Sequence, residues 1–213
     1  MRTLIAIPCM DTVQTQFFIS CLRMRTPADT EYTVASGSLI YDARNQLAKK
    51  AVTEGFDRVL WLDSDMTFSA DLFERMSFWL DAGLEFVSGM YFKRKAPFQP
   101  VVYQFCGMTE ENGEKIPKII PFSQYPADQL FEIEACGFGA VMMTTDLIRK
   151  VLDQFGLPFF PAMGFGEDLA FCLRARAAGA KLWCDSNIKL GHIGQIEFNE
   201  QIILEGMKWN ADI

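Results

Sequence analysis

The sequence predicts an α/β fold with a mostly parallel central sheet flanked by helices, and a smaller mixed β region in its second half. Two observations support this prediction. Short apolar runs alternate with helical patterns over the first ninety residues, as expected of repeated strand–helix units. One run, 59–62 (VLWL), is apolar throughout, as expected of a strand covered on both faces. The length of 213 residues, with 50% hydrophobic and 22% charged residues, indicates a single globular domain.

Each element of the first half has its own signal. Strands are predicted at 4–7, where an apolar run ends at a proline, and at 31–35, 59–62 and 86–90. Asp42 is predicted to cap a helix that extends to about residue 54 and is closed by Gly55. Ser69 is predicted to cap a second helix, which ends before Gly83.

The second half is more mixed, since five of the nine prolines lie between residues 91 and 126. Short strands are predicted at 101–105 and 118–120, and a longer strand at 132–143. Thr145 is predicted to cap a helix that reaches Phe155, and a loop follows at 159–166. A helix is predicted over 167–178, then a strand at 181–184 and a loop that carries His192.

Composition excludes several classes of function. The single histidine, His192, excludes a three-histidine zinc site and an HExxH protease helix. The net charge of −7 makes the chain a poor candidate for nonspecific binding to duplex DNA. The sequence shows neither a spanning apolar segment nor a signal peptide, so we expect a cytoplasmic protein. The six cysteines are widely spaced, and we expect most to be reduced and buried.

The first chemical signal is Asp63-Ser64-Asp65, directly after the strand at 59–62. Ligands of open α/β sheets bind at the carboxyl ends of strands. If the backbone stays extended, Asp63 and Asp65 project to the same side. Two close carboxylates repel each other unless a cation lies near, and a divalent metal that holds a diphosphate fits this requirement. The alternative is a polar turn between a strand and a helix.

Two further signals lie near the C-terminus. Glu167 and Asp168 open a helix, where the helix dipole favours ionised carboxylates, so they serve either helix stability or general base catalysis. His192 lies between Gly191 and Gly194. It is either a structural group or a ligand that completes a metal site begun by Asp65.

Taken in order, these segments resemble the GT-A glycosyltransferases, specifically the family 2-like nucleotide-sugar transferases. The resemblance spans nearly the whole chain. The residues that carry it are LIAIPC (4–9), ARN (43–45), VLWLDSD (59–65), GFG (137–139), GEDLAFCLRARAAG (166–179) and GH (191–192). It implies one domain over 1–213, with a nucleotide-binding half (1–90) and an acceptor-binding half (91–213).

The resemblance also implies residue roles. The donor would be a UDP- or GDP-sugar, bound by Pro8, Cys9, Asp42, Arg44, Asp63, Ser64, Lys93, Gly137 and Gly139. Pro8 and Cys9 would lie by the nucleoside, and the glycines by the sugar. Asp65 and His192, with Asp63, would bind Mn²⁺ or Mg²⁺. Asp168 would act as the base of an inverting transfer, and Glu167 would position the acceptor.

Three alternatives are weighed against this interpretation. A nucleotidyltransferase would need a glycine-rich loop after the first strand, where the chain reads PCMD (8–11). A noncatalytic nucleotide-sugar or carbohydrate-binding module would need no base. The acceptor is expected to be a glycan or a small molecule. It would instead be modified DNA if the basic side chains form a patch beside aromatic ones; these are residues 93–95, Lys115 and Lys118, with Tyr91, Phe92 and Phe98 nearby. The simpler explanation of the basic residues is an exposed loop with solvated charges.

Overall fold

A computed structural model describes residues 1–37, 39–111 and 113–194 of the chain. Its centre is a seven-stranded sheet with the order β2-β1-β3-β10-β5-β11-β8. The strands are β1 (Thr3–Cys9), β2 (Thr30–Ser36), β3 (Arg58–Leu62), β5 (Phe86–Met90), β8 (Leu130–Ile133), β10 (Ala140–Thr144) and β11 (Leu182–Lys189).

Five of the seven strands run in the same direction, which confirms the mostly parallel sheet. Strand β1 pairs in parallel with β2 and β3, and β5 pairs in parallel with β11. The exceptions are β10, which is antiparallel to both of its neighbours, and β8 at the edge. The insertion of β10 between β3 and β5 brings the glycines that precede it next to the end of β3.

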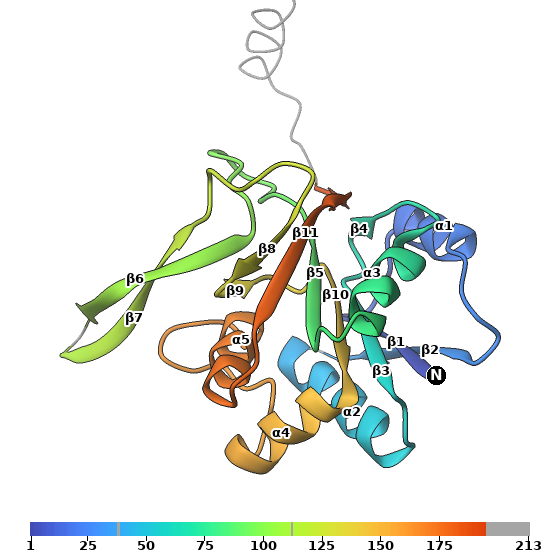
Figure 1. Cartoon of the computed structure of the whole chain (residues 1–213), viewed down its shortest axis with the longest axis horizontal. Coiled ribbons are helices and arrows are strands. Elements are labelled where there is room, and N and C mark those ends of the chain that lie inside the picture. The colour runs from blue at the N-terminus through green and yellow to red at the C-terminus, as the bar shows by residue number, and fades with distance from the viewer. Residues whose placement is uncertain (38, 112, 195–213) are drawn as a thin grey trace, which may run out of the picture.

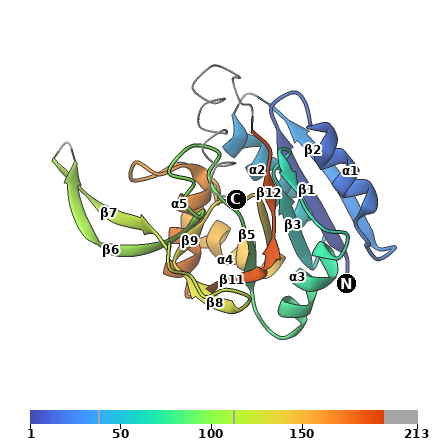
Figure 2. The same cartoon turned by 90° about the horizontal axis from the view of Figure 1, so that it is seen from above.

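Helices cover both faces of the sheet, so the domain has three layers (Figures 1 and 2). On one face lie α2 (Ile40–Thr53), α4 (Thr145–Phe155) and α5 (Glu167–Ala177). On the other face lie α1 (Thr15–Arg23) and α3 (Leu72–Asp81). No helix in the described part of the chain is long and apolar enough to cross a membrane.

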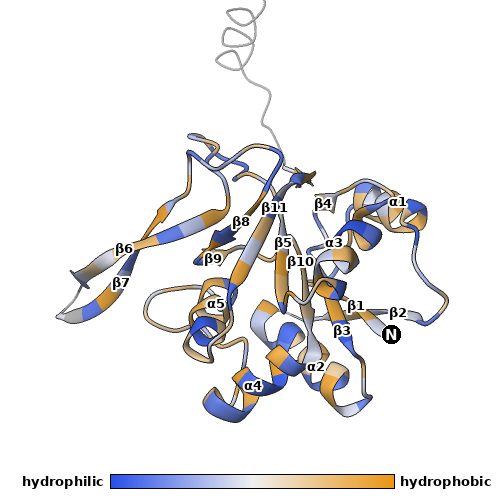
Figure 3. Cartoon of the chain, in the orientation of Figure 1, coloured by the Kyte–Doolittle hydropathy of each residue, from blue (hydrophilic) through white to orange (hydrophobic). Residues whose placement is uncertain are grey.

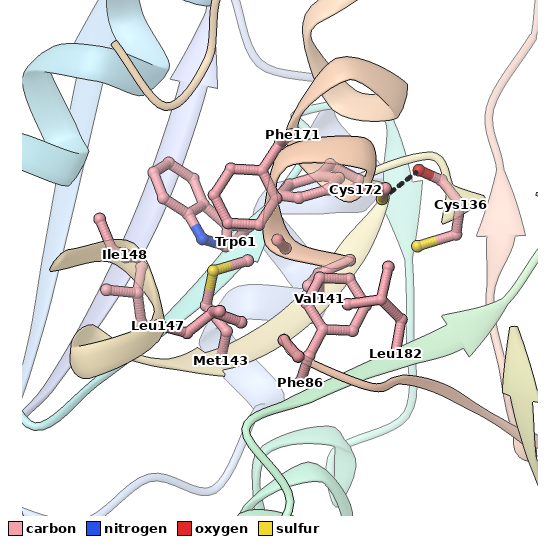
Figure 4. Close-up of a cluster of buried hydrophobic side chains, with 14 of the residues drawn as sticks. Trp61, Phe86, Cys136, Val141, Met143, Leu147, Ile148, Phe171, Cys172 and Leu182 are labelled. Atoms are coloured by element: carbon pink, nitrogen blue, oxygen red, sulfur yellow. Dashed lines mark hydrogen bonds between the residues drawn. The ribbon is translucent and has the colours of Figure 1, made fainter. Parts of the chain in front are cut away.

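The alternation of side chains along each strand divides the core between the two faces. Val59 and Trp61 of β3 pack with the α2–α4–α5 layer, while Leu60 and Leu62 face α1 and α3. Figure 4 shows the first of these clusters, in which Trp61 and Phe171 lie close to side chains of β10 and α4. Figure 3 shows hydrophobic residues along the central strands, β1 and β5 among them. Burial of this apolar surface is the main favourable term in folding.

The mixed β region forms two smaller sheets. Strands β6 (Val102–Glu111) and β7 (Glu114–Pro121) make a long antiparallel hairpin that projects from the body of the domain (Figure 1). Strand β9 (Ala135–Cys136) joins the hairpin on the β6 side. Strands β4 (Met66–Thr67) and β12 (Gly191–His192) form a separate two-stranded ribbon. The hairpin was predicted only as two short strands.

Several boundary predictions were wrong. Residues 132–143 do not form one strand, because β8, β9 and β10 each pair with a different neighbour. Helix α2 begins before Asp42, which lies in its first turn and caps nothing. Asp71, not Ser69, precedes α3, and Thr144, not Thr145, caps α4 by accepting a 3.2 Å hydrogen bond from the Leu147 amide. Helix α1 was missed altogether.

Gly137 tests the close packing beside β10. A Cβ atom here would lie 2.1 Å from the hydroxyl oxygen of Tyr91 and 2.7 Å from Val101 Cγ1. We expect Gly137→Ala to lower the free energy of unfolding by about 1–3 kcal/mol, because the buried neighbours must shift. Urea denaturation measures the change. Gly37→Ala, where the added methyl meets open space, is the matched control.

Combining Gly137→Ala with Tyr91→Phe should recover part of this loss, since the double variant removes the nearest atom. No recovery, or equal effects of the Gly137 and Gly37 changes, would contradict the packing explanation.

Candidate active site

The candidate site lies where β1 and β3 end and where α2 and α5 begin. Pro8 and Cys9, both buried, end β1, and the Cys9 carbonyl accepts a 3.2 Å hydrogen bond from the Gly37 amide. Asp63 follows β3, and its amide donates to the Gly139 carbonyl at 3.1 Å. Because β10 pairs with β3, the glycine segment before β10 (137–139) lies next to the acidic motif, and this hydrogen bond holds the backbone at Asp63.

Arg44 is the central side chain of the site. Its Nη2 donates to Asp63 Oδ1 at 2.7 Å, and its Nε donates to Glu167 Oε1 at 3.2 Å. Arg44 is only 2% exposed, whereas the side chains of Asp63 and Glu167 are 29% and 15% exposed. The guanidinium thus lies beneath two carboxylates and joins the end of β3 to the start of α5. This differs from the prediction that Arg44 would face the donor nucleotide.

Aromatic rings surround the same guanidinium. The Arg44 Cζ atom lies 5.1 Å from the Phe138 ring centre, 5.9 Å from that of Trp61 and 6.0 Å from that of Phe159. Ring faces attract a cation at such distances. Burial alone would lower the pKa of Arg44, but Asp63, Glu167 and Asp168 outweigh it and raise the pKa. Arg44 therefore stays charged, although its Nη1 has no hydrogen-bond partner among the described residues.

Asp168 lies in the same cluster without an ion pair in the described part of the chain. Its Oδ1 accepts a 2.7 Å hydrogen bond from the Leu169 amide at the start of α5. Burial, followed by the charge of Glu167, raises the pKa of Asp168 to about 6. Arg44 opposes this rise but is already paired with two other carboxylates. A carboxylate with a pKa near the working pH suits a general base.

The acidic motif forms a turn rather than an extended segment. The Met66 amide donates to the Asp63 carbonyl at 3.2 Å, so the condition under which both carboxylates would project to the same side is not met. Asp63 and Asp65 consequently find different partners, although the charge of Asp65 still contributes to the raised pKa of Asp63, whose chief cause is burial. Asp63 belongs to the Arg44 cluster, and Asp65 faces β12.

Asp65 and His192 form the second part of the site. His192 Nε2 lies 3.5 Å from Asp65 Oδ2, and His192 Nδ1 lies 2.8 Å from the Phe92 carbonyl oxygen. The Ile193 amide donates to the Asp65 carbonyl at 2.8 Å, which ties the end of β12 to the acidic turn. A carbonyl oxygen can only accept, so Nδ1 carries a proton and donates to Phe92. Nε2 donates to Asp65 while the imidazole is protonated, which raises the pKa of His192, and it is the nitrogen left to bind a metal in the neutral ring.

These two side chains fit one side of a divalent metal site. The described residues contain no group of three or more metal-ligating side chains, so the other ligands would be diphosphate oxygens and water. Arg94 was missed as a member of this site. Its Nη1 lies 2.8 Å from Asp65 Oδ2 and donates to the Ile193 carbonyl at 3.1 Å. The run of basic residues at 93–95 was the available signal.

The other predicted donor residues are more dispersed. Asp42 is exposed and lines a cavity with residues of α4, on a different face of α2 from Arg44. Ser64 lies in the acidic turn, where its carbonyl accepts from the Gln14 amide at 3.1 Å. Lys93 lines a separate pocket and is 3.4 Å from Gln99 Oε1. The structure therefore gathers Asp63, Glu167 and Asp168 closely but does not bring Asp42 or Lys93 to them.

The two predicted glycines of the site have a packing role. A side chain at Gly137 or Gly139 would overlap Tyr91, which is buried and was not predicted as a site residue. The Gly139 amide donates to the Tyr91 hydroxyl at 3.3 Å, and the Tyr91 ring lies edge-on to His192 at 5.3 Å. Tyr91 thus connects the glycine segment to the predicted metal ligand.

Structural comparison identifies the fold. The chain is similar to A197 from STIV, with a TM-score of 0.63 and 20% identity over 92% of this chain and 87% of that chain. It is also similar to GalNAc-T7, whose structure holds UDP, GalNAc and Mn²⁺, with a TM-score of 0.61 and 10% identity. That match covers 92% of this chain and 44% of GalNAc-T7. No protein-family model and no curated protein sequence matches the chain. The chain has a GT-A-type glycosyltransferase fold.

The raised pKa of Asp168 leads to a stability prediction. An aspartate ionises near pH 3.9 in an unfolded chain, so a folded pKa of about 6 destabilises the native state as pH rises between these values. Asp168→Asn removes this penalty, and its amide oxygen can still accept from Leu169. We expect the variant to be more stable than the native protein by on the order of 2 kcal/mol above pH 7, and equal near pH 4.

Thermal melts from pH 4 to pH 8 measure this difference. Asp146→Asn, in the exposed first turn of α4, is the control and should show no comparable gain. A gain from Asp168→Asn that does not depend on pH would contradict the raised pKa.

Proposed function

We propose that this chain is a metal-dependent glycosyltransferase that moves a sugar from a nucleoside-diphosphate sugar to an acceptor hydroxyl, with inversion. The proposal rests on one observation: a carboxylate with a pKa of about 6 lies in the same site as an aspartate–histidine pair, at the carboxyl end of the sheet. The similarity to GalNAc-T7 with UDP and Mn²⁺ bound supports this, and favours UDP over GDP in the donor.

The donor would lie across the end of the sheet. Pro8 and Cys9 at the end of β1 would flank the nucleoside, and Asp63 would meet the ribose or the sugar. Asp65 and His192 would hold Mn²⁺ or Mg²⁺, which supplies positive charge to the departing diphosphate when bound. Arg94, at 2.8 Å from Asp65, would add a second positive charge there.

The acceptor would approach from the side of α5. Asp168 would take the proton of its hydroxyl as the oxygen attacks the anomeric carbon from the face opposite the diphosphate. The new carbon–oxygen bond forms as the bond to the β-phosphate oxygen breaks, and the electron pair leaves with the nucleoside diphosphate. Glu167, held by Arg44 at 3.2 Å, would orient the acceptor.

The same observation weighs against a noncatalytic binding module. An ionised Asp168 is unfavourable to the fold, because burial and Glu167 raise its pKa. A module that only bound a sugar nucleotide would not need this carboxylate, whereas a base near neutral pH does.

Removing the predicted metal ligand tests donor binding. We expect Asp65→Ala to abolish Mn²⁺-dependent binding of UDP and UDP-sugars, because the remaining histidine cannot hold the cation alone. Thermal shift with each ligand, with and without Mn²⁺, is the measurement, since a ligand at 100 times its Kd stabilises by about 2.7 kcal/mol. Asp146→Ala should keep the full Mn²⁺-dependent shift. An unchanged shift in Asp65→Ala would remove Asp65 from the metal site.

Removing the predicted base tests the reaction. Asp168→Asn should bind the donor as the native protein does but lose transfer, or donor hydrolysis, by about 10²–10⁴-fold. In the native protein the rate should fall as pH drops through 6, because protonation of Asp168 removes the base. Turnover of the variant within a few fold of native would show that Asp168 is not the base.

A further inference from the structure

A second pocket adjoins the predicted metal site. It has a volume of about 280 Å³ and is lined by Phe92, Lys93, Arg94, Phe98, Leu190, His192 and Gly194. None of the four carboxylates of the candidate site lines it. His192 is the shared wall, because its Nε2 faces Asp65 while its ring also borders this pocket. A ligand in the pocket would therefore lie next to the predicted reaction centre.

The loop that forms the pocket is a small hairpin. Phe92 and Pro100 form an isolated β-bridge, and the Lys93 amide donates to the Gln99 carbonyl at 2.9 Å. The Phe98 amide donates to the Lys95 carbonyl at 2.9 Å, which closes the tip. The loop is thus held largely by its own backbone, together with the contacts of Arg94 to Asp65 and to the Ile193 carbonyl.

The pocket combines cations with aromatic surface. Lys93 has no carboxylate partner among the described residues; its ammonium lies 5.8 Å from the ring centre of Tyr103. Phe92 is 40% exposed and Phe98 is 62% exposed. Phe98 also has a φ of 47°, a conformation that bulky residues rarely adopt. An exposed, strained phenylalanine gains little from packing within the fold, so it points to a ligand.

We propose that this pocket binds a nucleotide unit of the acceptor, with its phosphate at Lys93 and Arg94 and its base against Phe98. The proposal rests on the proposed transferase function, for which it names the acceptor class. Aromatic rings beside basic side chains are the usual means of binding unpaired nucleotides. The unit would be a free nucleotide or part of a single strand, since a chain with a net charge of −7 is poorly suited to a long duplex.

The pocket borders the predicted metal site through His192 and Arg94 but lies away from the expected position of the donor nucleoside. The donor nucleoside is expected at the end of β1, whereas the loop follows β5, and β3 and β10 lie between these strands in the sheet. Both phenylalanines line one concave pocket, which suits a small flat group better than the plane of a membrane.

The test measures binding of fluorescent single-stranded dT10, with thymidine monophosphate and inorganic phosphate as competitors. We expect native protein to bind dT10, and Phe98→Ala to bind it about tenfold more weakly because base stacking is lost. Phe98→Tyr should retain binding. Phe78→Ala is the matched control, because Phe78 is also 62% exposed but lies on α3. Lys93→Gln should reduce the slope of log affinity against log salt by about 0.7.

The competitors identify the source of the nucleotide. Displacement of dT10 by thymidine monophosphate supports a free nucleotide, and displacement only by longer oligonucleotides supports a single strand. Displacement by inorganic phosphate at the same concentrations would contradict a role for the base.

Donor binding separates this inference from the proposed function. Asp65→Ala should lose Mn²⁺-dependent UDP binding yet keep dT10 binding. Phe98→Ala should keep Mn²⁺-dependent UDP binding and bind dT10 more weakly. Absence of dT10 binding by the native protein, or equal affinities for Phe98→Ala and Phe78→Ala, would overturn the inference even with UDP binding intact. Binding to phosphatidylserine vesicles without dT10 binding would likewise overturn it, in favour of a membrane surface.

Discussion

The site depends on one buried cation. Arg44, 2% exposed, pairs with Asp63 at 2.7 Å and with Glu167 at 3.2 Å, which lie 19 and 123 positions away in the chain. An unpaired buried carboxylate or guanidinium would be strongly unfavourable, so each group requires the others. This requirement fixes the start of α5 against the end of β3. It also bears on Asp168: burial and then Glu167 raise the pKa of this carboxyl, and Arg44, which is already paired with two other carboxylates, offsets only part of that rise.

The two parts of the site differ in how their charge is balanced. Around Arg44, the described residues pair one cation with Asp63 and Glu167 and none with Asp168, whose pKa is raised by burial and then by Glu167. At Asp65 the hydrogen bond and charge of His192, together with Arg94, outweigh the effect of burial and lower the pKa. One part therefore favours taking up a proton, as the proposed base must, and the other stays anionic, as the proposed metal ligand must.

The sequence predicted the fold class, and it named several residues that the structure brings together at the candidate site, but not the contacts among them. Buried runs such as 59–62 and the amphipathic helices were readable, because a strand covered on both faces must be apolar throughout. Helix α1 was missed because its exposed face carries Phe18 and Leu22, which weakens the polar–apolar contrast. Residues 132–143 read as one strand since local propensity does not show that three short segments pair with three different neighbours.

The same limit applies to the site residues. The carboxylates and His192 were proposed from their positions: Asp63 and Asp65 directly follow an apolar strand, Glu167 and Asp168 open a helix, and His192 is the single histidine. The burial of Arg44 was not predicted, because an arginine in the first turn of a helix looks the same in sequence whether it faces a ligand or the core. Tyr91 gave no separate signal and Arg94 only that of the basic run at 93–95, since their roles depend on the close approach of the segments around residues 139 and 193.

The most direct test of this account is the titration of the Asp168 carboxyl, followed by carbon NMR in the native protein and in Glu167→Gln. We expect the titration of the Asp168 carboxyl to have its midpoint near pH 6 in the native protein. The midpoint should be clearly lower in Glu167→Gln, because that change removes a neighbouring negative charge and leaves Arg44 less shared. A native midpoint near that of an ordinary aspartate, unchanged by Glu167→Gln, would contradict the claim that burial and the neighbouring Glu167 raise the pKa of the proposed base.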